Sequence, residues 1–352
     1  MSPRKTLVTA AGTIAAEAVP ANRGRRRLLG GLCALGAVAA TDALASDRRA
    51  AGVLTATDVH PKDYPTVAAV RWIGETLERE TGGRLRIRMY HAGQLGRESE
   101  TLEMARYGAI DFTRVYTGAL NNAFPLTRAL CMPFAFDSTA HQRRVHDGKV
   151  GADVLRGFEA RGVVGLALYD SGPRCFYNTR RPLHAPRDLA GLKIRVPPSD
   201  IFIELIGLLG GNPTPLPIGQ VFSALETHLI DGAENNIRSF HASRHFEAAR
   251  YWSQTGHSFA PDALLVSKRT LDALSRSDRG LLFDASRESV KVMRQRWDAS
   301  EAEARRALVD AGIRMNTVDV APFRRSAEPL VRELLRDPTL RALHAAIRDA
   351  AG

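Results

Sequence analysis

Residues 53–90 read VLTATDVHPKDYPTVAAVRWIGETLERETGGRLRIRMY, and this stretch decides the fold class. Val53 to Thr57 has the composition of a β-strand, Thr66 to Glu80 has the apolar spacing of a helix, and Leu85 to Tyr90 is a second strand. Gly82-Gly83 marks the end of the helix. The order strand, helix, strand predicts an α/β fold built from βαβ units, with largely parallel sheets.

The same alternation continues along the chain, and its 352 residues are enough for two lobes. The patterns predict further strands at 110–115, 163–169, 174–177, 193–196 and 263–267, a short strand leading into 231–236, and helices at 98–107, 201–209 and 219–228. The turn-rich residues 170–173 between two strands indicate a crossover between lobes. We expect lobe 1 at residues 46–170, with a return segment at about 256–276, and lobe 2 at 171–255.

A long helix is predicted from Asp278 to Ala311, because this segment has no proline and no glycine after Gly280. Its length of over thirty residues corresponds to roughly 45–50 Å. Such a helix can brace both lobes along one side. Residues 277–352 would comprise this helix and C-terminal helices.

Residues 1–45 have the features of a signal peptide. Arg25-Arg26-Arg27 precedes an apolar run and a small-residue stretch that ends at Ala43-Leu44-Ala45. The paired arginines followed by leucines fit a twin-arginine signal, and a general secretory signal is the alternative. Cleavage would make Ser46 the first mature residue, so a periplasmic location is expected.

Charge and cysteine content limit the remaining classes. The formal charge of +11 is spread along the chain and mixed with acidic residues, which disfavours nucleic-acid binding. Two cysteines, Cys131 and Cys175, remain after cleavage and are expected to be buried thiols, although a single bridge is conceivable. No later stretch reaches the ~18 apolar residues that span a bilayer, so the mature chain is not expected to be embedded in a membrane.

Catalytic motifs are scarce. His241 and His245 have a metal-ligand spacing on one helical face, but the glutamate of a zinc protease motif is missing. No nucleophile elbow, P-loop or dinucleotide-binding turn follows a strand. A zinc enzyme therefore stays only as a competing hypothesis, and no cofactor is expected.

Arginines at strand ends point instead to anion binding. Arg174 follows a turn, and Arg195 lies near the end of the strand at 193–196. Two guanidinium forks that converge would clamp a carboxylate, whereas the alternative for each is a surface ion pair. Asn235 closes a further predicted strand and has an amide that can bind a ligand or close a turn.

Several motifs resemble a known family. They are PRDLAGLKIRVP at 186–197, PTPLP at 213–217, QVFSALE at 220–226 and IDGAENN at 230–236, and the N-terminal half agrees through TGGRL at 81–85 and MPFAF at 132–136. This order is similar to the solute-binding subunits of TRAP transporters, the DctP family. The resemblance implies two α/β lobes that close on an organic acid about a hinge, a long helix across both lobes, and a membrane permease as partner. It also implies that Arg195, Arg174 and Asn235 hold the carboxylate.

A narrower likeness is to the branch that binds hexuronates such as glucuronate and galacturonate. It is carried by DVHPKDYPTV at 58–67, YDSGPR at 169–174 and FYN at 176–178, and it implies that His60, Glu98 and Arg114 contact sugar hydroxyls. Ile218 stands where many members have an aromatic ring, which leaves a stacking contact in doubt. A four-carbon dicarboxylate or another organic acid is the alternative ligand, with Arg114 as the second cationic site.

Overall fold

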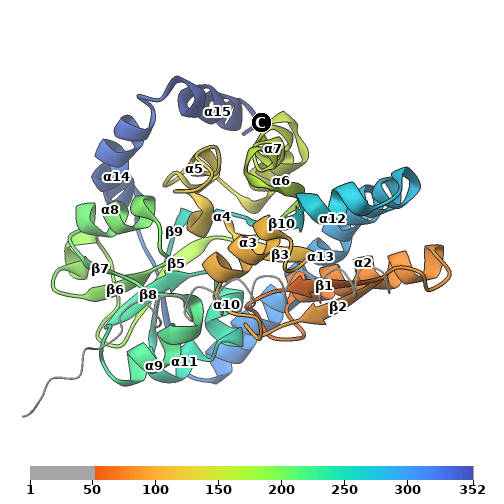
Figure 1. Cartoon of the computed structure of the whole chain (residues 1–352). Helices are drawn as coiled ribbons and strands as arrows, with labels where there is room; N and C mark the ends of the chain where they lie inside the picture. The colour runs from red at the N-terminus through yellow and green to blue at the C-terminus, as the bar shows by residue number, and fades with distance from the viewer. Residues whose placement is uncertain (1–51, 352) are drawn as a thin grey trace, which may run out of the picture. The chain divides into compact units, whose positions relative to one another are not determined.

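The computed structural model describes residues 52–351, which contain two β-sheets with helices on both faces of each (Figure 1). The first sheet has the order β2-β1-β3-β10-β4, formed by Arg86–Tyr90, Val53–Thr57, Phe112–Tyr116, Asp262–Ser267 and Val163–Tyr169. The second has the order β11-β9-β5-β8-β6-β7, formed by Arg314–Thr317, Tyr251–Ser258, Arg174–Asn178, Gly232–Asn235, Lys193–Val196 and Asn212–Pro215. The expected two-lobed α/β fold is confirmed.

The sheets are mixed, so the expectation of largely parallel sheets is wrong. β1 is parallel to β2 and β3, and β6 is parallel to β7 and β8. By contrast, β10 is antiparallel to β3 and β4, and β5 is antiparallel to β8 and β9. The reason is that β4 leads directly into β5 and β9 directly into β10, so two long strands cross between the lobes in opposite directions.

The helices that precede the crossing strands β9 and β10 in the chain cover both sheets. They are α2 (Pro65–Glu80), α3 (Glu98–Tyr107), α4 (Thr117–Leu120), α5 (Thr127–Cys131), α6 (Thr139–Asp147) and α7 (Lys149–Arg156) in the first lobe, and α8 (Asp200–Leu208), α9 (Val221–Glu226), α10 (Ile237–Ala242) and α11 (His245–Ala248) in the second. Successive side chains of β5 point to opposite faces of the sheet, so this strand contributes to two apolar cores. Phe176 joins the apolar core that also contains α8, while Cys175 and Tyr177 join the core on the opposite face.

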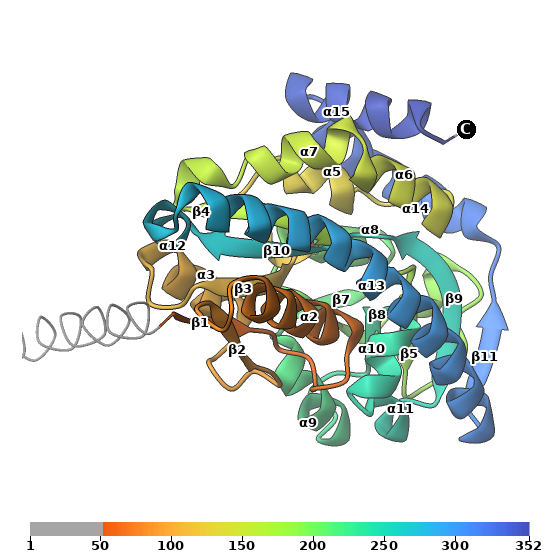
Figure 2. The ribbon, with the colours of Figure 1, turned by 90° about the vertical axis from the view of Figure 1, so that its right-hand side faces the viewer.

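The predicted long helix is present as α13, Arg276–Asp310, and follows the short helix α12, Lys268–Ala273. Its 35 residues correspond to about 52 Å. Met293 and Trp297 belong to the core of the first lobe, together with residues of α2, whereas Leu308 belongs to the core of the second lobe. Figure 2 shows α13 running alongside α2 and on to α10. One uninterrupted helix therefore contacts both lobes.

The last two helices also contact both lobes. α14 (Val320–Leu334) packs on α8 and β9, and α15 (Pro338–Asp349) returns to α5 and α7. They form the arc at the top of Figure 1.

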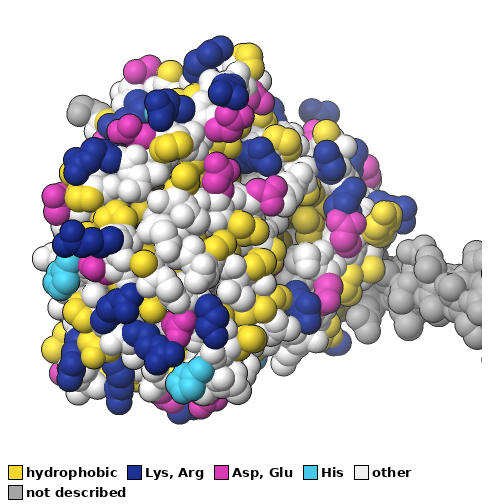
Figure 3. Space-filling model, turned by 90° about the vertical axis from the view of Figure 1, so that its left-hand side faces the viewer, with side chains coloured by type: hydrophobic (Ala, Val, Ile, Leu, Met, Phe, Trp, Pro, Cys, Tyr) yellow, Lys and Arg dark blue, Asp and Glu magenta, His cyan; other side chains and the backbone are white. Residues whose placement is uncertain are grey.

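Charge on the surface is spread. On the face in Figure 3, Lys and Arg side chains lie among acidic and apolar ones, with a denser group toward the lower left. This face carries no continuous basic stripe.

Candidate functional site

The ends of strands from both sheets meet around one small cavity. Arg114 lies in β3, Arg174 begins β5, Arg195 lies in β6 and Asn235 ends β8. The carboxyl ends of parallel strands and the starts of their antiparallel neighbours share one edge, which is where α/β sheets bind ligands. The cavity is lined by Val59, His60, Glu98, Arg114, Tyr116, Ser171, Arg174, Arg195, Pro197, Ile218, Asn235, Asn236, Ser239 and Asp262. All six residues proposed from the sequence are in this set, although their role in binding stays a prediction.

Arg174 is fixed by a buried carboxylate. Its Nε donates to Glu234 Oε2 at 2.5 Å and its Nη2 to Glu234 Oε1 at 2.8 Å. Burial alone would raise the pKa of Glu234, but Arg174 and His257 outweigh it and hold that pKa below its usual range. The guanidinium also lies 4.5 Å from the centre of the Tyr116 ring. Arg174 is therefore oriented before any ligand arrives, and its charge is already balanced.

Arg195 has a different environment. Its side chain is almost fully buried, with 3 % of the residue exposed, and its Nε donates to the carbonyl of Leu216 at 2.7 Å. Among the described residues, no carboxylate lies within 4.0 Å of its guanidinium nitrogens. Burial without a counter-ion lowers the pKa of Arg195. A desolvated cation of this kind gains free energy when an anion enters the cavity.

Asn235 lies beside both arginines. Its Oδ1 accepts hydrogen bonds from Arg174 Nη1 at 3.1 Å and from the backbone N–H of Asn236 at 2.8 Å. These contacts orient the amide so that Nδ2 is the group left for a ligand oxygen.

The opposite wall of the cavity is built around Arg114. Its Nη1 donates to Glu98 at 2.8 Å and to Asp262 at 3.1 Å, and its Nη2 donates to Asp58. Burial alone would raise the pKa of Asp58, but Arg114 and His60 hold it well below its usual range. Because three carboxylates surround this one guanidinium, the structure gives no support to Arg114 as a second cationic site.

His60 and Glu98 are each held by neighbours. The His60 ring stacks on Tyr64 at 3.8 Å between centroids, and its Nδ1 lies 2.9 Å from Asp58. Glu98 begins α3, and its Oε1 also accepts from the backbone N–H of Tyr116 at 2.9 Å. Both side chains reach the cavity from the first lobe.

Sequence reasoning missed several groups at this site. Asp58 and Asp262 contact Arg114 from positions 56 and 148 residues away along the chain, so no local spacing could reveal them. Tyr116 supplies an aromatic ring under Arg174, although Ile218, the position expected for a ring, also lines the cavity.

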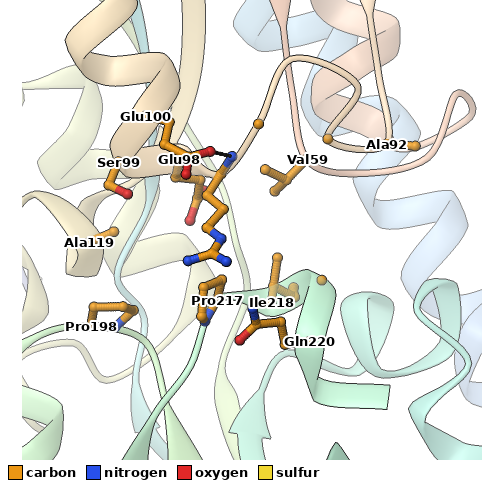
Figure 4. A pocket seen from close by; sticks show the side chains of 14 residues that line it. Val59, Ala92, Glu98, Ser99, Glu100, Ala119, Pro198, Pro217, Ile218 and Gln220 are labelled. Atoms are coloured by element: carbon orange, nitrogen blue, oxygen red, sulfur yellow. Dashed lines mark hydrogen bonds between the residues drawn. The ribbon is translucent and has the colours of Figure 1, made fainter. Parts of the chain in front are cut away.

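A wider cavity of about 500 Å³ lies next to the inner one and shares Val59, Glu98 and Ile218 with it. Figure 4 shows Glu98, Ser99 and Glu100 on one side of it and Pro198, Pro217, Ile218 and Gln220 on the other. The inner cavity has only about 30 Å³ of free space, roughly two water molecules by the same measure. A sugar-sized ligand needs more space than this inner cavity has in the structure.

The histidine pair does not form the predicted helical face. His241 lies in α10 and His245 in α11, because Arg244 between them has a left-handed φ of 56° that ends the first helix. His245 Nδ1 lies 2.7 Å from the Tyr177 hydroxyl. Among residues 52–351, no group of three His, Cys, Asp or Glu side chains could hold a metal ion.

Two further expectations concern the whole chain. Cys131 and Cys175 are buried free thiols, as predicted. Within residues 52–351, no helix has both the length and the apolar run needed to cross a membrane. Residues 1–45, where the signal peptide was predicted, lie outside the described part.

Two lobes joined by crossing strands, with a buried arginine between them that has no carboxylate partner among residues 52–351, are the arrangement expected of a solute-binding protein. The model of the bacterial extracellular solute-binding proteins, family 7 (DctP), matches residues 56–337. The chain belongs to this family, so the resemblance seen in the sequence is confirmed.

Relatives support the assignment over nearly the whole described chain. A TRAP periplasmic solute-binding protein from Xanthobacter autotrophicus, solved with β-D-galacturonate, is 42 % identical, with a TM-score of 0.82 over 84 % of this chain and 99 % of that one. One from Pseudomonas putida, solved with D-glucuronate, is 34 % identical, with a TM-score of 0.80 over 82 % of this chain and 96 % of that one. A solute-binding protein from Chromohalobacter salexigens is 33 % identical over 83 % of this chain and 88 % of its own length.

Proposed function

We propose that this chain captures a hexuronate, such as galacturonate or glucuronate, and delivers it to the membrane permease of a TRAP transporter. The observation that carries the proposal is Arg195, a buried cation at the cavity with no carboxylate partner among the described residues. The ligand carboxylate would bind the guanidinium of Arg195 and the second N–H of Arg174 Nη1, with the amide of Asn235 donating to it. Its hydroxyls would contact His60, Glu98 and Arg114.

The balance of charge favours a single carboxylate at this end of the cavity. Arg174 is neutralised by Glu234, so Arg195 contributes one unmatched positive charge. Charge-assisted hydrogen bonds contribute ~1.5 to 3 kcal/mol each, while micromolar affinity requires about 8 kcal/mol. Two arginines and a few hydroxyl contacts are therefore sufficient. The galacturonate and glucuronate bound to the structural relatives are ligands of this kind.

The mechanism we propose is capture by closure of the lobes. Lobe 1 would comprise residues 46–170 with the return segment at about 256–276, and lobe 2 residues 171–255. The crossing strands β4–β5 and β9–β10 are the connections about which such a motion can occur. The chain would act as a binding protein and not as an enzyme, and residues 1–45 would direct its export to the periplasm.

Isothermal titration calorimetry on the mature chain, residues 46–352, tests the proposal. We expect micromolar or tighter binding of D-galacturonate or D-glucuronate and no measurable binding of the neutral sugars D-galactose and D-glucose, which lack the carboxylate. Failure of both uronates to bind under conditions where the protein is folded would reject it.

A further inference from the structure

The two ends of the cavity differ in charge, and this difference bears on which anions the site accepts. The end with Arg174, Arg195 and Glu234 has one positive charge in excess. The end with Arg114 has Asp58, Glu98 and Asp262 around that guanidinium, with His60 beside Asp58. A ligand that spans the cavity therefore meets a cationic wall at one end and an anionic wall at the other.

The anionic wall leaves little of Arg114 available to a ligand. Its Nη1 donates to Glu98 and Asp262, and its Nη2 donates to Asp58 and lies 2.6 Å from His60 Nδ1. A ligand carboxylate needs two parallel N–H groups of a guanidinium for a bidentate contact. At Arg114, a ligand carboxylate could reach two such N–H groups only by displacing one of the protein carboxylates, and that displaced carboxylate would stay nearby and repel it.

The same wall has acceptors that suit hydroxyl groups. Glu98 Oε2 and Asp262 Oδ2 make no hydrogen bond within residues 52–351, and both side chains line the cavity. Burial raises the pKa of Asp262 in spite of Arg114. The pKa of Asp58, which is held well below its usual range, keeps a negative charge at this wall.

We infer that Glu98 and Asp262 are specificity-determining residues, which make the site select sugar acids with one carboxylate. This inference rests on the proposed function. Sugars that carry a carboxylate at both ends would place the second one against this wall. The wall accepts hydrogen bonds from the hydroxyl groups at the other end of a uronate and repels a second anion, which is discrimination by an unfavourable contact.

The test compares each uronate with the dicarboxylate of the same configuration by calorimetry. Wild-type protein is expected to bind D-galacturonate or D-glucuronate at least 100-fold more tightly than D-galactarate or D-glucarate. In the double variant Glu98→Gln, Asp262→Asn, Arg114 keeps one carboxylate partner and the wall becomes neutral. The quantity compared is the ratio of the dissociation constant of the dicarboxylate to that of its uronate. We expect this variant to lower that ratio at least 10-fold, mainly through tighter binding of the dicarboxylate.

Two controls keep the outcome interpretable. Glu103→Gln removes one charge from the same helix, α3. Glu103 pairs with Arg106 and does not line the cavity, so the ratio of dicarboxylate to uronate dissociation constants should equal that of wild type. The single variant Glu98→Gln, with thermal unfolding of every protein, provides a folded intermediate if the double variant is unstable. It should shift the ratio in the same direction.

The outcomes separate this inference from the proposed function. Wild-type binding of a dicarboxylate as tightly as its uronate would overturn the inference alone. A folded variant with an unchanged ratio would also overturn it. Binding of succinate, with no uronate bound, would overturn both. Binding of a different monocarboxylate such as D-gluconate and of neither uronate, with dicarboxylates still rejected, would overturn the proposed function and support the inference.

Discussion

Replacing Arg195 by methionine should abolish ligand binding while leaving the fold intact. Methionine keeps much of the aliphatic volume and removes the guanidinium. A bidentate contact supplies two charge-assisted hydrogen bonds of ~1.5 to 3 kcal/mol each. Their loss corresponds to an affinity about 10² to 10⁴ times weaker.

The expected stability effect is small because of how Arg195 is held. Its single hydrogen bond to the Leu216 carbonyl, at 2.7 Å, is worth about 1 kcal/mol. Removing a buried cation without a counter-ion relieves a desolvation cost that offsets this loss. The melting temperature of the ligand-free protein should therefore stay close to that of wild type.

Calorimetry with D-galacturonate and scanning calorimetry of the ligand-free protein measure the two effects. Arg187→Met is a suitable control, since Arg187 is exposed in the second lobe and does not line the cavity. Retained affinity in Arg195→Met would refute the assignment of the carboxylate site. Global unfolding of this variant would refute the view that Arg195 is structurally dispensable.

Three further changes should have different consequences. Arg174→Met should lose binding and also destabilise the protein by about 3–5 kcal/mol, because Glu234 would stay buried without its partner; an unchanged denaturant midpoint would contradict this. Asp170→Asn, at the crossover, should cost only about 1 kcal/mol, because burial raises the pKa of this carboxyl in spite of its pairs with α6 and α13, whose two arginines each keep another carboxylate; urea unfolding measures the loss, and one of about 3 kcal/mol or more would disprove this. The pKa of Asp58 is lower in the folded chain than its unfolded value of about 3.9. The ionised carboxylate therefore stabilises the folded chain above that pH, and this stabilisation is lost progressively as the pH falls below it. Asp58→Asn should therefore lose less stability between pH 5 and 3 than wild type, and equal losses would refute this.

Regular elements could be predicted wherever the local pattern was strong. Glu98–Tyr107 and Val163–Tyr169 have the bounds predicted from the sequence. The helix expected at 219–228 is shorter, Val221–Glu226, because a 3₁₀ turn at Ile218–Gln220 precedes it. Element boundaries near such turns depend on backbone geometry that residue spacing does not specify.

Strands with weak patterns were missed. β7 contains two prolines, which remove backbone donors, yet it is tolerated because it lies at the edge of its sheet. β11 is a four-residue edge strand that joins the second sheet only after the chain has passed along α13. Neither position can be derived from local sequence.

The arginines of the site could be proposed from the sequence, but their charge balance could not. Arg174 and Arg195 look equivalent as residues at strand ends, and only the fold brings Glu234 to Arg174 and, within residues 52–351, no carboxylate to Arg195. Likewise Arg114 looked like a candidate anion receptor until Asp58 and Asp262 were found around it. The tertiary fold determines which arginine has a carboxylate partner, and this decides which guanidinium is available to bind a ligand anion.

Residues 46–352 contain two cysteines, Cys131 and Cys175, and this segment is convenient for site-specific labelling. Burial raises the pKa of Cys131 to about 12 and that of Cys175 to about 11, so neither forms a reactive thiolate near neutral pH. One new cysteine on the outside of each lobe would therefore react with maleimide dyes or spin probes in the otherwise wild-type protein. Pairs of such labels could follow the separation of the lobes as ligand is added.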